Sequence, residues 1–191
     1  MFEHARAAGL PMLGGLDITI DHNRHRVRGH FWAADAAAHD PDTALAQSTP
    51  PAFSSVKTIV ILPGFTEFCE KYTAEFLRFH QMGFNVLAID WPGQGHSGHF
   101  GHHWLAVHCT DFDDHLQALN RLIEAVGLAS QPITLFGHSM GGHLALRYAA
   151  WRPDLVQGVI LSAPMMAPPA MPVWRSEEHT SELQSPDHLV C

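Results

Sequence analysis

Apolar runs alternate with amphipathic stretches along most of the chain. Four apolar runs are typical of buried strands: Thr58–Leu62 (TIVIL), Val86–Ile89, Ile133–Phe136 and Val159–Leu161. Three intervening segments have apolar side chains at spacings of three and four, which predicts helices: Glu70–Met82, Phe112–Val126 and Met140–Ala150. Strands that alternate with helices of this length predict an α/β fold with a largely parallel sheet.

The N-terminal part of the chain follows a different pattern. The runs Asp17–Ile20 and Val27–Trp32 flank a polar turn and predict a hairpin. Residues 33–55 are rich in Ala, Asp, Thr and Pro without a clear period, and we interpret them as a long loop or insertion.

Ligands of parallel sheets bind beyond the carboxyl ends of the strands. Three loops leave those ends, and the candidate chemistry is sought there: Pro63–Glu67, Asp90–Gly98 and Gly137–Gly142.

The strongest motif is a G-x-S-x-G, Gly137-His138-Ser139-Met140-Gly141, between a predicted strand and a predicted helix. In such a turn the serine hydroxyl stands at a sharp strand-to-helix corner, and the glycines let neighbouring backbone approach without a Cβ clash. The first N–H groups of the helix face a developing negative charge. This context predicts that Ser139 is a catalytic nucleophile rather than part of an ordinary glycine-rich turn.

An oxyanion hole requires a second N–H donor from another loop. Phe65 follows the TIVIL strand, and its backbone N–H is the candidate partner for that of Met140. Thr66 offers an additional hydroxyl donor. The competing interpretation is that Pro63-Gly64 is simply a turn.

Three longer strings connect these motifs to a known superfamily: PGFTEFCEKYTAEFLRFHQMGFNVLAIDWPGQGHSG, DFDDHLQAL and LFGHSMGGHLALRYAAWRPDLVQGVILSAPMM. Together they resemble the α/β-hydrolases, in particular the bacterial lysophospholipase and monoacylglycerol lipase-like branch. The resemblance runs from about Thr58 to Met166. It implies that Ser139 is the nucleophile, that Phe65 and Met140 provide the oxyanion-hole N–H groups, and that the enzyme uses no cofactor or metal. Phe65 departs from the small or charged residue that is frequent in this branch.

The same resemblance implies an acid and a histidine after the nucleophile, in the order Ser…Asp/Glu…His. Asp154 follows a predicted helix and faces the wrong end of the sheet, and His143 lies on the helix after Ser139. We therefore expect the triad Asp and His to lie beyond the present end. A serine without its base is a weak nucleophile, so this chain is expected to be inactive as it stands.

The chain changes character at Arg175, where a polar string without a period begins, RSEEHTSELQSPDHLVC. It resembles the translation of a common sequencing-library adapter, and the alternative is a genuine polar tail. We expect residues 1–174 to be the N-terminal portion of a single α/β-hydrolase domain and residues 175–191 to be a non-native tail.

Composition excludes several classes of protein. The 191 residues include 11 Lys+Arg and 19 Asp+Glu, a formal charge of −8, with 46% hydrophobic residues. This balance argues against disorder and against a nucleic-acid binder. Three cysteines, Cys69, Cys109 and Cys191, form no motif, and the N-terminus has no apolar leader, which together favour the cytoplasm. The oligomeric state is not predicted, and transient contact with a membrane surface is left open.

Other polar residues have simpler interpretations. The histidines of one loop are interpreted as solvated rather than metal-binding: His96, His99, His102, His103 and His108. Asp111 is expected to cap a helix, and Asp90 to hold its own loop by hydrogen bonds. The glycines of GQGHSG lack the lysine and spacing of a phosphate-binding loop.

The predicted function is hydrolysis of carboxylic esters through an acyl-enzyme on Ser139, with a lysophospholipid or monoacylglycerol as the small-molecule substrate. Two alternatives remain. One is another chemistry of the superfamily, as in a peptidase or a general esterase or thioesterase. The other is a non-catalytic protein with the hydrolase fold.

Overall fold

The computed structural model describes residues 15–23, 25–34, 57–98 and 111–166. Three regions discussed above lie outside this part of the chain: the predicted insertion apart from its first two residues, the four histidines from His99 to His108, and the tail at 175–191. No helix in the described ranges is long and apolar enough to cross a membrane.

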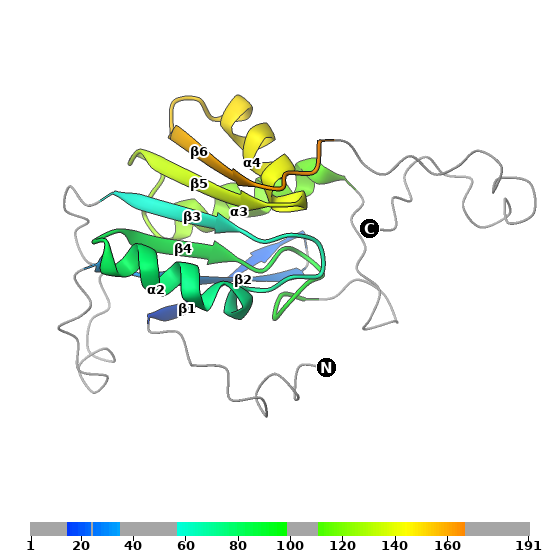
Figure 1. The fold of residues 1–191 in the computed structure, drawn as a ribbon. Coiled ribbons are helices and arrows are strands. Elements are labelled where there is room, and N and C mark those ends of the chain that lie inside the picture. The colour runs from blue at the N-terminus through cyan, green and yellow to red at the C-terminus, as the bar shows by residue number, and fades with distance from the viewer. Residues whose placement is uncertain (1–14, 24, 35–56, 99–110, 167–191) are drawn as a thin grey trace, which may run out of the picture.

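The described strands form one sheet of six, in the order β1-β2-β4-β3-β5-β6 (Figure 1). Its strands are β1 (Leu16–His22), β2 (His25–Trp32), β3 (Thr58–Leu62), β4 (Asn85–Ile89), β5 (Ile133–His138) and β6 (Val156–Ser162). The β1–β2 hairpin joins β4 in antiparallel pairing, and the other pairs are parallel. The prediction of an α/β fold with a mostly parallel sheet and an N-terminal hairpin is confirmed.

Helices cover the two faces of the sheet unequally. On one face, α3 (Phe112–Ala125) and α4 (Met140–Trp151) pack Leu119, Leu122 and Leu144 against the strands in the larger core. On the other face, α2 (Thr73–Gln81) places Phe76 over β3 and β4 in a smaller core (Figure 1). Every residue of β3 and β4 is buried, as expected for strands covered on both faces.

The helix expected at Glu70–Met82 differs from the observed one at its start. Cys69–Tyr72 form a 3₁₀ turn, η3, and the α-helix begins only at Thr73. Leu77, on α2, is exposed. The Cys69 N–H at the start of the 3₁₀ turn donates to the buried carboxylate of Asp90 at 2.8 Å, a contact that spacing in the sequence does not reveal.

The remaining helices agree with the pattern. Asp111 caps α3, since its side chain accepts a hydrogen bond from the Asp113 N–H at 2.9 Å. α3 ends one residue earlier than expected and α4 one residue later. β6 extends beyond the expected Val159–Leu161 at both ends.

Candidate active site

Ser139 lies at the corner between β5 and α4, at the carboxyl ends of the parallel strands. Its φ is +50° and its ψ is −117°, a backbone conformation that L-residues rarely adopt. The Ser139 N–H donates to the Ser162 carbonyl at 3.0 Å, and the Ser139 carbonyl accepts from the Met165 N–H at 2.9 Å. The end of β6 and the residues just after it therefore hold both the N–H and the carbonyl group of Ser139.

Two glycines make this corner sterically feasible. A Cβ on Gly137 would lie 2.5 Å from the Gly141 carbonyl oxygen, and one on Gly141 would lie 2.0 Å from the Leu62 carbonyl oxygen. No side chain fits at either position. The first helical turn therefore sits directly on the end of β3, where the candidate oxyanion loop begins.

The loop after β3, Pro63–Glu67, lies beside this corner. Phe65 is half-buried and packs against the larger core, which also contains Met140. Thr66 is exposed, and its φ is +61°. Trp91, fully buried, donates from Nε1 to the Pro63 carbonyl at 2.8 Å. Loop and corner thus lie at the same end of the sheet, and the pairing of the Phe65 and Met140 N–H groups in an oxyanion hole stays a prediction.

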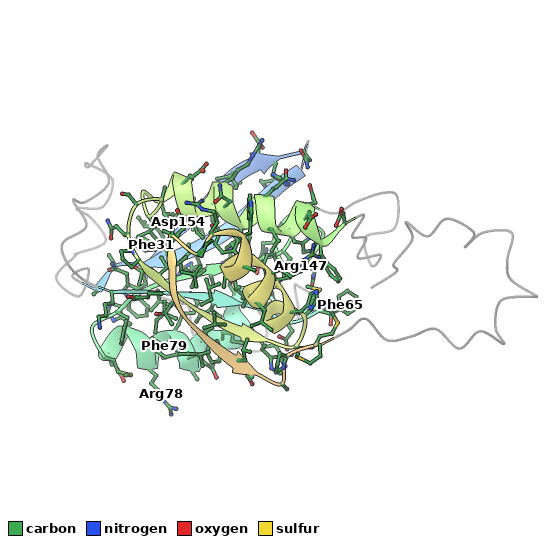
Figure 2. The ribbon with its side chains drawn as sticks, turned by 90° about the horizontal axis from the view of Figure 1, so that it is seen from above. Phe31, Phe65, Arg78, Phe79, Arg147 and Asp154 are labelled. Carbon is green, nitrogen blue, oxygen red and sulfur yellow. The ribbon has the colours of Figure 1, made fainter. Side chains whose placement is uncertain are left out.

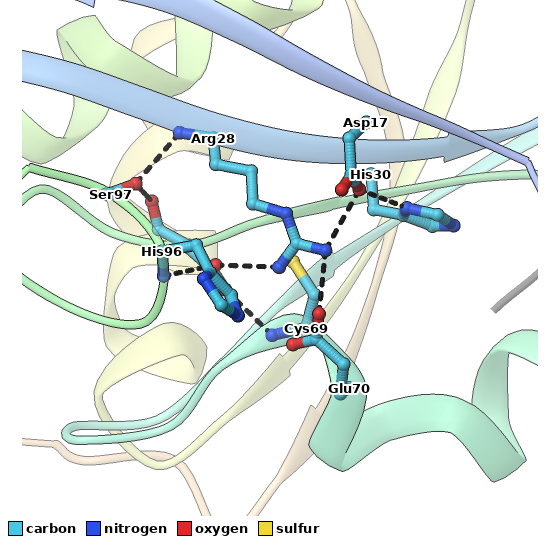
Figure 3. Close-up of polar contacts among 8 residues, drawn as sticks. Asp17, Arg28, His30, Cys69, Glu70, His96 and Ser97 are labelled. Atoms are coloured by element: carbon cyan, nitrogen blue, oxygen red, sulfur yellow. Dashed lines mark hydrogen bonds and ion pairs between the residues drawn. The ribbon is translucent and has the colours of Figure 1, made fainter. Parts of the chain in front are cut away.

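The loop after β4 is held by Asp90, whose side chain is fully buried. Its carboxylate accepts hydrogen bonds from Arg28 Nη1 at 3.0 Å and from the His96 N–H at 2.8 Å. Arg28 also pairs with Glu70 at 2.7 Å (Figure 3). These contacts join β2, the η3 turn and the Asp90–Gly98 loop, and they bear out the expected structural role of Asp90. Among the described residues, no cluster of three metal-ligating side chains is found.

Neither Asp154 nor His143 has a side chain that hydrogen-bonds to the Ser139 hydroxyl. Asp154 is exposed, ion-paired with Arg152 at 3.0 Å, and lies at the opposite end of the molecule from Phe65 (Figure 2). His143 packs against the Phe112 ring with centroids 5.4 Å apart. Within the described ranges, the Ser139 hydroxyl has no hydrogen-bond partner. The sequence expectation for Asp154 and His143 agrees with this placement.

A hollow of about 200 Å³ opens beside the serine corner on the face that α2 partly covers. Glu67, Tyr72, His138 and Ser162 are among its lining residues, and His138 Nδ1 lies 3.3 Å from Ser162 Oγ. The sequence pattern did not single out Glu67 or Tyr72 as site residues. The one available signal was their position just after the candidate oxyanion donor.

Comparison with known proteins adds the family. The family model described as "Serine aminopeptidase, S33" (Hydrolase_4) matches residues 54–185, more than half of the chain. The chain belongs to this family of α/β-hydrolases. The resemblance that the sequence motifs indicated is therefore confirmed at the level of the superfamily.

Several curated relatives are about 30% identical to this hydrolase over the residues that align. It is 29% identical over 112 residues to "Phospholipase YtpA" of Bacillus subtilis (strain 168), a match covering 58% of this chain and 41% of the relative. "Monoacylglycerol lipase" of Mycolicibacterium smegmatis is 31% identical over 111 residues, which cover 56% of this chain and 37% of the relative. "Lysophospholipase L2" of Escherichia coli (strain K12) is 32% identical over 115 residues, covering 57% and 33%. The chain thus spans less than half the length of these relatives.

Solved structures show the same fold at lower identity. "Thioesterase Domain From Curacin Biosynthetic Pathway" superposes with a TM-score of 0.62 at 21% identity, covering 86% of this chain and 51% of that one. A thermostable carboxyl esterase from Bacillus coagulans superposes with a TM-score of 0.59 at 21% identity, covering 79% and 44%. Both confirm the α/β-hydrolase fold.

Proposed function

We propose that this hydrolase cleaves carboxylic esters of lipids, with a lysophospholipid or a monoacylglycerol as substrate and Ser139 as nucleophile. The main support is the backbone of Ser139, at positive φ between β5 and the start of α4, in the place where this fold presents its serine. The names of the relatives, a phospholipase, a monoacylglycerol lipase and a lysophospholipase, favour lipid esters over other acyl compounds.

In the proposed reaction, Ser139 Oγ attacks the ester carbonyl while its proton passes to a base. The carbonyl oxygen becomes an oxyanion that the N–H groups of Phe65 and Met140 stabilise. The C–O bond to the alcohol then breaks and the alcohol takes the proton, which leaves an acyl-enzyme. Water hydrolyses this ester and restores the Ser139 hydroxyl. We place the base and its orienting acid outside the described residues, because no side chain of the described histidines hydrogen-bonds to the Ser139 hydroxyl.

A second reaction is favoured by the description of the family model, serine aminopeptidase. The same nucleophile and oxyanion donors would then act on a peptide amide. Amide bonds need an acid to protonate the leaving amine, whereas activated esters do not. Aminoacyl p-nitrophenyl esters, which need no such acid, therefore test this alternative, and the lipid-ester proposal predicts that they acylate Ser139 more slowly than p-nitrophenyl butyrate does.

The proposal is tested by acylation of Ser139 in the 191-residue chain, measured separately from turnover. The chain is incubated with p-nitrophenyl butyrate and imidazole, which supplies an external base, and the Ser139 peptide is followed by mass spectrometry. We expect a butyryl group on Ser139 that accumulates at least about tenfold faster than on other hydroxyls, because only this one faces an oxyanion hole.

The matched controls are Ser139→Ala and Ser162→Ala. The Ser162 hydroxyl lies 3.3 Å from His138 Nδ1, so it is the competing nucleophile at this end of the sheet. Labelling that disappears in Ser162→Ala but persists in Ser139→Ala would refute the assignment of Ser139. Without imidazole, turnover by the chain is expected to match that of Ser139→Ala.

A further inference from the structure

One carboxylate ties together the loop that contains the proposed Phe65 donor. Glu67 Oε2 accepts hydrogen bonds from the Gly64 N–H at 2.7 Å and from the Tyr72 hydroxyl. Glu67 Oε1 accepts from Lys71 Nζ at 2.7 Å. The Glu67 N–H in turn donates to the Gly64 carbonyl at 3.3 Å. The turn from Gly64 to Glu67 is therefore closed by both the backbone and the side chain.

The conformation held in this way is not a relaxed one. Thr66, between Phe65 and Glu67, has a φ of +61°, a left-handed conformation that is unfavourable for a β-branched residue. Such a backbone persists only where neighbouring contacts over-determine it. Phe65 and Thr66 are held at both ends of their segment. Glu67, which follows them in the sequence, is fixed by its side-chain hydrogen bonds, and Pro63, which precedes them, accepts a hydrogen bond from Trp91.

The turn also abuts the candidate nucleophile. A Cβ on Gly64 would lie 2.7 Å from Glu67 Oε2 and 3.3 Å from His138 Cδ2, and His138 immediately precedes Ser139. A shift of the Gly64 backbone would therefore alter its packing against His138, the residue before Ser139. Glu67 is buried, and although burial raises the pKa of a carboxyl, the bonds from Lys71 and Tyr72 outweigh this and hold its pKa below the ordinary value.

We infer that Glu67 is a positioning residue that fixes the Gly64–Thr66 backbone so that the Phe65 N–H points at the oxyanion formed on Ser139. This inference rests on the proposed function. It assigns Glu67 no contact with the substrate. Its effect is to preorganise the Phe65 N–H, and a donor fixed in advance stabilises an oxyanion without the cost of reorganisation.

Two substitutions separate positioning from charge. Glu67→Ala removes every acceptor, and we expect the maximal rate of Ser139 acylation to fall about 10- to 100-fold, approaching the loss of one oxyanion donor. The ester concentration at half-maximal rate should not change. Glu67→Gln keeps an acceptor for Gly64 and Tyr72 and should remain within about threefold of the wild type. Glu75→Ala, a carboxylate lining the same hollow from α2, is the matched control and should have no effect.

A second readout is independent of catalysis. In ¹⁵N NMR, hydrogen exchange of the Gly64 amide should accelerate at least about tenfold in Glu67→Ala, with a shifted Phe65 amide signal, and neither change should occur in Glu67→Gln. Urea unfolding shows whether the fold is intact. If Glu67→Ala unfolds, Tyr72→Phe takes its place, with an expected loss of about threefold or more in acylation.

The outcomes separate the two proposals. If the wild type is not acylated at Ser139, the proposed function fails, and the Gly64 and Phe65 amides alone decide whether Glu67 holds the loop. If Glu67→Ala changes neither acylation nor these amides, the positioning role is wrong. Equal losses in Glu67→Ala and Glu67→Gln would also overturn it, because charge rather than geometry would then be responsible.

Discussion

His115 is a titratable side chain held inside the core. It is 1% exposed and stacks on Trp91 with ring centroids 5.4 Å apart. Burial lowers its pKa to about 4, and the nearby carboxylate of Asp114 opposes this only in part. The folded protein therefore keeps this imidazole neutral at pH values where the unfolded chain protonates it.

The sign of the resulting pH dependence follows from this difference. Above pH 6.5 both states are neutral and His115 contributes nothing. Between pH 6.5 and about 4 the unfolded chain binds more protons, so the free energy of unfolding falls with falling pH. We expect a loss of about 2 kcal/mol on going from pH 6.5 to pH 5, measured by urea unfolding.

His115→Gln should flatten this slope, whatever it does to stability at pH 7. The same substitution at His143, half-buried on α4, is the matched control. A slope that survives in His115→Gln would show that another group is responsible. Measurements stay above pH 5 because the carboxylates of Asp17, Glu67 and Glu70, whose pKa values are lowered, contribute only at more acidic pH.

Among the elements, α4 is placed most tightly, since its first turn rests on the end of β3. Gly141→Ala would put a methyl group 2.0 Å from the Leu62 carbonyl oxygen, which is backbone and cannot swing aside. We expect a loss of about 3 kcal/mol in the free energy of unfolding, together with slower acylation of Ser139.

Gly158→Ala, in β6, is the control for Gly141→Ala. The nearest atom to a Cβ there is Thr134 Oγ1 at 3.6 Å, an ordinary contact. This change should alter stability by less than about 0.5 kcal/mol. Similar losses for the two variants would mean that the close approach of α4 to β3 is not what makes Gly141 necessary.

The elements themselves could be predicted from the sequence because apolar spacing reports burial directly. The apolar run Thr58–Leu62 predicts a buried strand, and all five of its residues are buried in the structure. The start of α2 could not be predicted, since the 3₁₀ turn before it begins with a Cys69 N–H bonded to Asp90, which lies 21 residues further along the chain. The role of Arg28 is likewise hidden, because its partner Asp90 is 62 residues away. Motif spacing located Ser139, but not the contacts that shape the loop opposite it.

At the scale of the whole molecule, the sheet is covered unevenly. α2 lies over β3 and β4, whereas β6, in the described part of the sheet, pairs with β5 alone. Ile160 is 44% exposed and pairs in register with Phe136, which packs against Phe79 of α2, so Ile160 lies on the same face of the sheet as α2 and stays exposed there. An apolar edge strand of this kind favours association with other chains.

We therefore expect the 191-residue chain to self-associate with increasing concentration in sedimentation velocity. Ile160→Lys should weaken this association about tenfold or more, because it replaces apolar edge surface by a charge. Ser130→Lys, in the exposed turn before β5, adds the same charge away from the edge and should change nothing. A wild type that stays monomeric, or equal effects of both lysines, would contradict this expectation.

The hydrogen bonds from Ser139 to Ser162 and Met165 have a consequence for biosynthesis. They join the serine corner to the end of β6 and the residues just after it, which are made more than twenty residues later. A nascent chain in which Ser139 has left the ribosome but Met165 has not can form the helix, since its contacts are local. It cannot yet fix the serine's backbone. The backbone geometry of the proposed nucleophile thus arises only after β6 has been synthesised and paired.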